Sequence, residues 1–396
     1  MLSVSEATAR VLELVARLPA EEVELGAADR RVLARAIVAG RDLPAVATSA
    51  MDGFAARAAD LPATLPVVGA IAAGDAPGAL AAGAATRIMT GAPLPAGADT
   101  VVMFEDAQAA ADGATVGLPA SPVGANVRPV GEDIAIGEGA LAAGVRLGWG
   151  ELGLLAALGH ARVAVVRRPV VAIIATGDEL VDVATTPGPG QIVDSSAYML
   201  AAQIARAGGV PRYLGVARDR LEAVVAMIEQ ALTADVVLTT GGVSVGDHDH
   251  VKAALTSLGV ALDFWKVAMK PGKPLAVGRH GTVPIFALPG NPVSSAVAFE
   301  LFVRPALLAM QGVAVTARPR APVVLPDGYR KPPGRAHYLR ARLRRDGERL
   351  IAELHPKQGS AILSSLVELD ALVEIAAELG TIAPGMTTSA LLLRAA

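Results

Sequence analysis

The sequence predicts a multidomain protein: a central α/β domain with a doubly wound parallel sheet, accompanied by domains built mostly of β-strands. Apolar, β-branched runs alternate with amphipathic segments over residues 169–315, which is typical of a parallel sheet with helices on both faces. Residues 44–137 are rich in Gly, Pro and Ala with short β runs, and β patterns return after residue 316. The 396 residues are enough for two to four domains.

Bulk composition excludes several classes of function. Hydrophobic residues make up 53% of the chain and charged residues 18%, so it is not a disordered protein. A net charge of −3 and 3% aromatic residues argue against nucleic-acid binding. The first residues form a charged amphipathic segment rather than a signal peptide, and the most apolar run, residues 163–175, is interrupted by Arg167, Arg168 and Pro169. Because there is also no Cys, we expect a cytoplasmic protein without disulfides, Cys–zinc sites or a membrane span.

The N-terminal segment begins with a predicted helix. Ser3 and Glu6 form a capping box, and the apolar spacing extends this helix to about Leu18. A shorter helix is expected at residues 27–33, and a third helical pattern at 150–159 follows the β-rich part. We therefore expect a helical linking segment in two pieces (1–43 and 138–168) around a small β domain (44–137), followed by an α/β domain (169–315) and a C-terminal β-barrel (316–396).

The elements of the α/β domain follow from the periodicity of its apolar residues. Asp219 and Glu222 form a second predicted capping box. Strands are expected at residues 170–175, 213–216, 236–238, 262–267 and 283–288, and helices at 195–207, after Asp219, after Asp249 and at 292–310.

The stretch from residue 235 to 258, DVVLTTGGVSVGDHDHVKAALTSL, organises this domain. Its strand ends on Gly241 and Gly242, and an amphipathic segment begins near Asp249. A strand, a glycine turn and a helix N-terminus together favour an anion cradle, although the spacing fits neither GxxxxGK[ST] nor GxGxxG. Asp247 and Asp249 make the rim acidic, so a bound phosphate needs a divalent cation or nearby lysines.

A lysine loop supplies candidate cations. The chain has six Lys among 35 basic residues, yet Lys266, Lys270 and Lys273 fall within eight residues. A compact ammonium suits phosphate, and Pro271 and Pro274 stiffen the loop. A solvated turn is the alternative interpretation.

Three turns are expected to converge on one cleft. TGDE (176–179), TTGG (239–242) and LPGN (288–291) each follow a predicted strand, and parallel sheets bind ligands at the carboxyl ends of their strands. In the small β domain, SAMDG (49–53), RIMTGAP (87–93) and GED (131–133) are, taken alone, most simply β-turns.

Nine motifs in order along nearly the whole chain carry a family resemblance. They are SAMDG (49–53), RIMTGAP (87–93), GED (131–133), TGDEL (176–180), GQIVDS (190–195), GGVSVGDHD (241–249), KPGKP (270–274), LPGNPVS (288–294) and QGS (358–360). Together they resemble the molybdopterin molybdenumtransferase family, the MoeA-type enzymes and the gephyrin E domain. The resemblance implies four domains and an elongated homodimer with each active site between subunits. It also implies insertion of molybdate, as substrate, into adenylylated molybdopterin with Mg²⁺-dependent release of AMP, and it allows contacts with other cofactor-assembly proteins.

The resemblance also implies roles for particular residues. The catalytic candidates are Glu179, Asp249, Asp52 and Asp219. The substrate-binding candidates are Thr90, Asp178, Thr240, Gly241, Gly242, Ser244, Lys270, Lys273, Pro289, Asn291, Pro292 and Ser360. Asp52 and Thr90 are expected to reach the cleft from the partner's β domain. Asp178, Glu179, Asp247 and Asp249 are the candidate ligands of Mg²⁺, a hard cation that prefers carboxylate and phosphate oxygen.

The sequence departs from the family pattern at four places. Residues 45–48 and Phe54 replace an aromatic-Asp-Asn run and a Tyr, Ser196 stands where Asn is common, and His248 stands where an aromatic residue is common.

Three other functions stay open from the sequence. Adenylyl transfer from ATP to molybdopterin uses a similar α/β domain, but such enzymes usually lack the flanking β domains and KPGKP. A His/Asp metallohydrolase is favoured only by DHDH (247–250), whose successive side chains diverge on a turn. A non-catalytic scaffold would not need the acidic cluster.

Overall fold

The computed structural model describes residues 1–76, 78–242 and 250–394, and the chain separates into two compact units. The first unit comprises Met1–Glu21, Arg30–Val32 and Val165–Ala396, and the second comprises Glu22–Asp29 and Leu33–Ala164. The finer division into four domains stays a prediction.

The first unit contains the predicted doubly wound α/β domain. Its six-stranded sheet has the order β16-β13-β17-β21-β20-β18. The strands are β13 (Val170–Thr176), β16 (Val210–Ala217), β17 (Val236–Thr240), β18 (Ala261–Trp265), β20 (Ala276–His280) and β21 (Val283–Leu288). The first four strands in this order are parallel. Strand β20 is antiparallel to both of its neighbours, β21 and β18, so β18 runs in the same direction as the first four. The sequence did not predict β20. Only residues 281 and 282 separate it from β21, and so short a turn can join only antiparallel strands.

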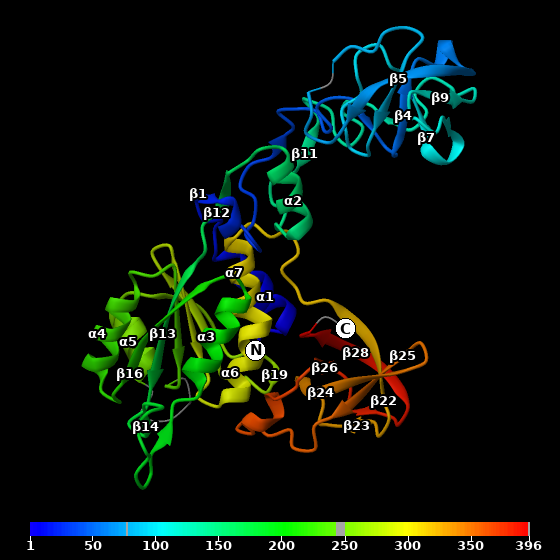
Figure 1. Cartoon of the computed structure of the whole chain (residues 1–396). Helices are drawn as coiled ribbons and strands as arrows, with labels where there is room; N and C mark the ends of the chain where they lie inside the picture. The colour runs from blue at the N-terminus through cyan, green and yellow to red at the C-terminus, as the bar shows by residue number, and fades with distance from the viewer. Residues whose placement is uncertain (77, 243–249, 395–396) are drawn as a thin grey trace. The chain divides into compact units, whose positions relative to one another are not determined.

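Helices cover both faces of this sheet (Figure 1). They are α3 (Ser196–Arg206) and α6 (Pro292–Ala298) on one face, and α4 (Leu221–Ala231) and α5 (His250–Ser257) on the other. Neighbouring strand residues point to opposite faces. Ile173 and Leu238 therefore pack with α3 and α6, whereas Ile174 and Val237 pack with α4 and α5.

The predicted helix at 292–310 is one continuous core helix made of α6, a π-helical segment η4 (Phe299–Val303) and α7 (Arg304–Met310). Among the described residues it alone is long and apolar enough to cross a membrane, but 83% of its most apolar window is buried within the protein. Its apolar character is thus explained by its place in the core.

The N-terminal helix is shorter than predicted. The capping box of α1 (Val4–Glu13) is present, because Glu6 N donates to Ser3 Oγ at 3.2 Å and Ser3 N donates to Glu6 Oε2 at 2.8 Å. The helix ends at Glu13 rather than at Leu18. Leu18 N instead donates to Met310 O at 2.8 Å, so the chain leaves the helix to follow α7.

The C-terminal part of the first unit is a closed five-stranded barrel, as predicted. The strands β24 (Ala336–Asp346), β25 (Arg349–Leu354), β22 (Arg320–Leu325), β28 (Met386–Leu392) and β26 (Ala371–Ile375) pair in this order, and β26 pairs back with β24. Strand β19 (Met269–Lys270), within the lysine loop, pairs with β24 and places Lys270 opposite His337. The smaller elements of this unit are β14 (Leu180–Val181), β15 (Ile192–Val193), β23 (Tyr329–Arg330), β27 (Thr381–Ile382) and the 3₁₀ turn η5 (Leu363–Leu366).

The second unit is built around a six-stranded sheet of order β7-β4-β6-β5-β9-β8. The strands are β4 (Gly53–Ala56), β5 (Ala63–Ile71), β6 (Ala85–Ile88), β7 (Thr100–Met103), β8 (Gln108–Ala109) and β9 (Thr115–Leu118). Helix α2 (Trp149–Ala157) lies where a helix was predicted. Other short elements are η1 (Leu25–Ala27), β2 (Ile37–Val38), β3 (Thr48–Ser49), η2 (Ala58–Asp60), η3 (Phe104–Asp106), β10 (Val127–Arg128) and β11 (Gly139–Leu141). Two strands, β1 (Ala20–Glu24) and β12 (Arg162–Val166), lie where the chain passes from one unit to the other.

The helix predicted at residues 27–33 is wrong. Only η1 forms near it, Arg30 has a positive φ of 60°, and Leu33 N donates to Val145 O at 2.8 Å. This long-range backbone hydrogen bond takes the place of a local one that a helix would need.

Candidate active site

A cleft of about 700 Å³ lies in the first unit at the carboxyl ends of β13, β17 and β21. It is lined by Thr176, Gly177, Glu179, Leu180, Ile192, Val193, Asp194, Ser195, Ser196, Asp219, Thr240, Gly241, Gly242, Pro274, Pro289, Gly290, Asn291, Pro292, Ala361 and Leu363. The three turns that the sequence predicts to converge all contribute to this lining.

The glycine turn after β17 is shaped by close packing. Gly241 and Gly242 have positive φ angles of 93° and 64°. A Cβ on Gly241 would lie 2.6 Å from Thr176 O, and one on Gly242 would lie 2.5 Å from Val251 Cγ2. Glycine is therefore required at both positions.

The backbone amide of Gly241 is not available to an anion. It donates to Leu288 O at 3.1 Å, at the end of the neighbouring strand β21. Gly290 lies directly beside this turn, where its Cβ would be 3.5 Å from the Cα of Gly241. The predicted cradle is thus a double turn, made of the turn at Gly241 and Gly242 and the neighbouring turn at Gly290. Gly241 shapes it through its backbone conformation and does not donate a hydrogen bond to a ligand.

Carboxylates also contribute to the cleft. Glu179 and Asp219 line it. Asp178 N donates to Asp219 Oδ2 at 3.4 Å, and Asp219 N donates to Asp178 Oδ1 at 3.2 Å. This contact overturns the capping box predicted for Asp219 and Glu222. Helix α4 begins after Arg220 without a side-chain cap, because the carboxylate of Asp219 is turned toward Asp178 instead.

The described residues supply part of the predicted magnesium site. Within residues 1–76, 78–242 and 250–394, no group of three or more His, Asp or Glu side chains is arranged to hold a metal ion. Neither Glu179 nor Asp219 forms an ion pair with a Lys, Arg or His of these segments. Mg²⁺ is commonly bound by one or two carboxylates together with substrate phosphates, and this donor set fits it. The predicted residues Ser244, Asp247 and Asp249 lie outside the described residues.

The lysine loop lies at the edge of the cleft. Lys270 and Lys273 are exposed and are not among the lining residues, whereas the adjacent Pro274 is. Two backbone bonds close the loop on itself, Lys266 N to Leu275 O at 3.0 Å and Val267 N to Lys273 O at 3.1 Å.

The C-terminal barrel contributes the loop that contains the predicted Ser360. Ser360 O accepts a hydrogen bond from Val293 N at 3.1 Å, at the start of α6, and the next residue, Ala361, lines the cleft. The fully buried Arg340 holds this loop, donating to Gly359 O at 3.0 Å and to Ser365 Oγ at 3.1 Å. Burial lowers the pKa of Arg340 to about 10. Sequence reasoning missed Arg340, because it lies in an ordinary β run with other arginines.

Three further lining residues were missed at or next to a motif. Asp194 and Ser195 end the GQIVDS motif after β15, and Ser196 is the first residue of α3. That motif supported the family resemblance, but none of these side chains was among the predicted site residues.

The second unit brings together Asp52 and Thr90. Strands β4 and β6 pair with Gly53 opposite Ile88, which places the SAMDG and RIMTG turns side by side. Thr90 donates to Asp52 Oδ1 twice, from its backbone N at 2.7 Å and from Oγ1 at 2.8 Å. These bonds lower the pKa of the exposed Asp52, so it stays anionic at neutral pH.

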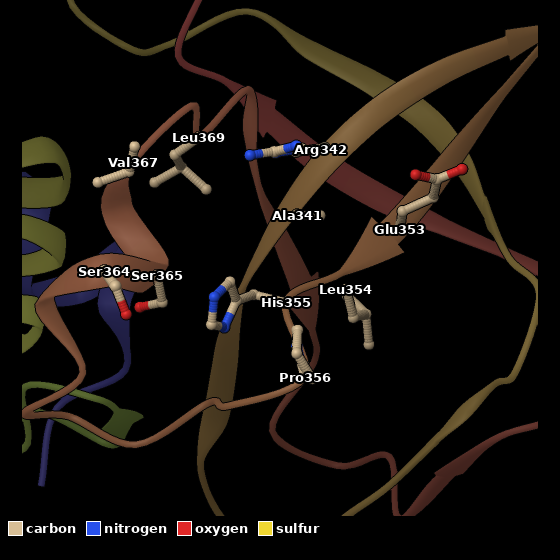
Figure 2. A pocket seen from close by; sticks show the side chains of 10 residues that line it. All are labelled: Ala341, Arg342, Glu353, Leu354, His355, Pro356, Ser364, Ser365, Val367 and Leu369. Carbon is tan, nitrogen blue, oxygen red and sulfur yellow. The ribbon is translucent and has the colours of Figure 1, made fainter.

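A second cavity, of about 450 Å³, is lined by residues of β24, β25 and the segment around η5 (Figure 2). His355 lies between the pair Ser364 and Ser365 and the apolar Leu354 in this view. The charged residues on its rim, Arg342 and Glu353, form ion pairs with Glu368 and Arg344. None of the predicted site residues lines this cavity, so the cleft at the strand ends is the better candidate site.

Comparison with known proteins covers nearly the whole chain. Residues 2–159 match the family described as MoeA N-terminal region (domain I and II), residues 172–309 the one described as Probable molybdopterin binding domain, and residues 322–393 the MoeA C-terminal region (domain IV). Molybdopterin molybdenumtransferase 2 of Mycobacterium tuberculosis is 37% identical over 399 residues, which cover 97% of this chain and 98% of that protein. The molybdopterin molybdenumtransferase of Synechococcus elongatus is 40% identical, covering 93% of this chain and 94% of that protein.

The fold agrees with these sequence matches. The crystal structure of the molybdopterin biosynthesis MoeA protein of Pyrococcus horikoshii has a TM-score of 0.86 and 31% identity, with 100% of both chains covered. The resemblance read from the nine motifs is thereby confirmed, and the chain belongs to the MoeA family of molybdopterin molybdenumtransferases.

Proposed function

We propose that this protein inserts molybdate into adenylylated molybdopterin and releases AMP, in the molybdenum-cofactor pathway. The observation that carries the proposal is the cleft, where Glu179, Asp219 and the glycine turn converge at the ends of three strands in a chain that matches molybdopterin molybdenumtransferases over its length. An adenylylated substrate has a phosphoanhydride, and this cleft offers backbone turns and carboxylates for its phosphates and their cation.

Each wall of the cleft has a separate role in this proposal. Gly241, Gly242 and Gly290 line the cleft and carry no side chain, so their backbone is proposed to contact the phosphates. Asn291 and Pro292 begin the core helix α6, whose N-terminus favours negative charge. Thr240, the last residue of β17, and Pro289, which follows β21, complete the wall.

The acidic wall is proposed to hold Mg²⁺. Asp178, Glu179 and Asp219, with Asp247 and Asp249 from outside the described residues, would be its ligands or neighbours. When bound, Mg²⁺ neutralises phosphate charge and so favours departure of AMP. Asp178 orients Asp219 through the reciprocal hydrogen bonds, which keeps one carboxylate facing the cleft.

Two groups outside the cleft lining are proposed to act on the anionic substrates. Lys270 and Lys273 balance the charge of phosphate or molybdate, and their exposure leaves the ammonium groups available. Ser360, fixed by its bond to Val293, contacts the substrate from the barrel side. Asp52 and Thr90 are proposed to complete the site from a partner subunit, in a homodimer that works in the cytoplasm beside other cofactor-assembly proteins.

Of the other functions, an adenylyltransferase is not favoured, because the matches include both the N-terminal and the C-terminal MoeA regions. Of the DHDH motif that suggested a metallohydrolase, the described residues include only His250, the first residue of α5, so that function stays a hypothesis.

A turnover assay tests the proposal. The purified protein is incubated with adenylylated molybdopterin, molybdate and Mg²⁺, and AMP release and active cofactor are measured. We expect both products from the wild type, neither from Glu179→Gln, and wild-type yields from Glu353→Gln, whose carboxylate is exposed in the barrel. Adenylylated molybdopterin formed from ATP and molybdopterin would instead support the adenylyltransferase, and cofactor assembly unaffected by Glu179→Gln would support the scaffold.

A further inference from the structure

Asp194 is a buried carboxylate in the wall of the cleft. Its side chain is 3% exposed, and it lies between β15 and α3. No Lys, Arg or His of the described segments forms an ion pair with it. A buried carboxylate without a cation needs hydrogen-bond donors to remain in place.

The protein supplies two of these donors, one to each oxygen. Ala197 N donates to Asp194 Oδ1 at 3.1 Å, and the hydroxyl of Tyr213 donates to Oδ2 at 2.9 Å. An ionised carboxylate has about four acceptor positions. Asp194 therefore retains one acceptor position on each oxygen, and these two positions can serve a ligand with two neighbouring donors.

Apolar residues near this carboxylate in the chain also line the cleft. They are Leu180, Ile192 and Val193, and the pairing of β14 with β15 places Leu180 beside Ile192. Asp194 follows Val193 directly. A flat heterocycle packed on apolar lining residues and held at its edge by a polar group is a common arrangement in pockets that bind ring systems.

Tyr213 fixes the direction of the carboxylate from outside the cleft. It lies on β16, opposite Ile173 of β13, and its ring packs beside Tyr198 with centroids 6.5 Å apart. Partial burial and the bond to Asp194 raise the pKa of Tyr213, so its hydroxyl remains a donor. Tyr213 does not line the cleft, so its effect on a ligand passes through Asp194.

We propose that Asp194 binds the amino-pyrimidinone edge of the pterin and that Tyr213 is its positioning residue; this rests on the proposed function. A pterin presents an exocyclic amino group next to a ring N–H, two adjacent donors that match the two free acceptor positions. The amino edge of adenine presents one donor beside an acceptor nitrogen, which would face a carboxylate oxygen unfavourably. Asp194 thus distinguishes the pterin end of the substrate from its nucleotide end.

Binding measurements with two ligands test this assignment. We expect Asp194→Asn to weaken binding of adenylylated molybdopterin at least tenfold, about 1.4 kcal/mol, and to leave the Kd of AMP within twofold of the wild-type value. The Asn oxygen can still cap Ala197 N, and a thermal unfolding curve checks that the variant is folded. If AMP binding weakens by the same factor, Asp194 contacts the nucleotide. If the Kd values of both ligands are unchanged, Asp194 contacts neither. Either result overturns the proposal.

Tyr213→Phe tests the positioning role. We expect a KM for adenylylated molybdopterin several-fold above wild type with an unchanged kcat, because the binding edge is disturbed and the phosphate end is not. Tyr198→Phe, a neighbouring tyrosine variant, is expected to leave both constants unchanged. A fall in kcat as large as the rise in KM would contradict the role. So would equal effects of the two Phe variants. If the wild type itself fails to bind adenylylated molybdopterin, the proposed function fails, and not this assignment alone.

Discussion

Asp178 and Asp219 each donate a backbone N–H to the other's carboxylate, at 3.4 and 3.2 Å, across the turns that follow β13 and β16. Two carboxylates therefore stand close together without an ion pair to a basic side chain of the described segments. The backbone bonds hold them in place, and the arrangement leaves Asp219 facing the cleft.

Replacing the acidic residues of the cleft should raise the requirement for magnesium. We expect Asp219→Asn to reduce AMP release by about 100-fold at limiting Mg²⁺ and to recover partly at high Mg²⁺, because one carboxylate ligand is lost. The Asn oxygen can still accept from Asp178 N, so the fold should be retained. The measurement is the initial rate over a Mg²⁺ titration, with a chelator as the zero point. A Mg²⁺ dependence identical to that of the wild type would remove Asp219 from the metal site.

The glycine turn should be intolerant of a single methyl group. In Gly241→Ala, the positive φ of 93° costs about 1–2 kcal/mol, and the overlap with Thr176 O adds about 1–3 kcal/mol. Gly259→Ala is the matched control, because Gly259 also has a positive φ, 68°, but a Cβ added there would have no atom within 4 Å. Urea unfolding of both variants gives the comparison. Equal free energies of unfolding would show that crowding at Gly241 is relieved.

Subunit mixing tests whether Asp52 and Glu179 serve one site from two chains. If they do, Asp52→Asn and Glu179→Gln are each inactive alone, but a mixed dimer contains one site with both native residues. Random mixing should then restore about a quarter of wild-type AMP release, since half of the dimers are mixed and each has one intact site. Mixed dimers as inactive as either parent would place both residues in the same chain's site.

The buried pair of Glu300 and Arg318 should stabilise the first unit strongly. Glu300 lies on the π-helical segment of the core helix, and Arg318 lies just before the barrel and also donates to Leu393 O at 3.2 Å. We expect Glu300→Gln to lower the free energy of unfolding by about 3 kcal/mol, because it leaves a buried guanidinium without its anion. The control is Glu368→Gln, whose pair with Arg342 is about 60% exposed and should contribute less than about 1 kcal/mol. Similar losses for both variants would argue against a special role for the buried pair.

His337 should make stability depend on pH. Burial, together with Lys270, Lys331 and Arg335, lowers its pKa to about 4 from the ordinary 6.5. Its contribution is complete above pH 6.5 and is lost as the pH falls toward 4, because the unfolded chain takes up a proton in this range and the folded chain does not. The loss should be on the order of 2–3 kcal/mol, measured by chemical unfolding at pH 7.5 and pH 4.5. His337→Asn keeps an acceptor for the hydroxyl of Tyr329, 3.1 Å from His337 Nδ1, and should flatten this part of the pH profile. A profile as steep as that of the wild type would assign the dependence to other groups.

Elements that depend on a local sequence pattern were predicted correctly. The capping box at Ser3, the core helix beginning at Pro292 and the strands β13, β17 and β21 all appear in the structure. Each depends on periodicity or capping within a few residues. The turns after these strands also line one cleft, since the carboxyl ends of parallel strands meet at one edge of a sheet.

Predictions that ignored long-range contacts were wrong. The helix at 27–33 is replaced by backbone bonds to distant segments, and α1 stops early because Leu18 pairs with Met310. The capping box at Asp219 had the right spacing, but Asp178, 41 positions away, supplied a competing partner. Strand β20 was hidden in an apolar stretch that follows the lysine loop.

The sequence by itself determined the family, the α/β and barrel architecture, and most of the turns that form the cleft, because these follow from local patterns and ordered motifs. Tertiary structure alone decided that the N–H of Gly241 is used by Leu288, that Asp178 faces Asp219, and that Asp194 is buried against Tyr213. These relationships join residues that lie in different strands or just after them. Their distances depend on sheet order and register, which no single segment of the chain specifies.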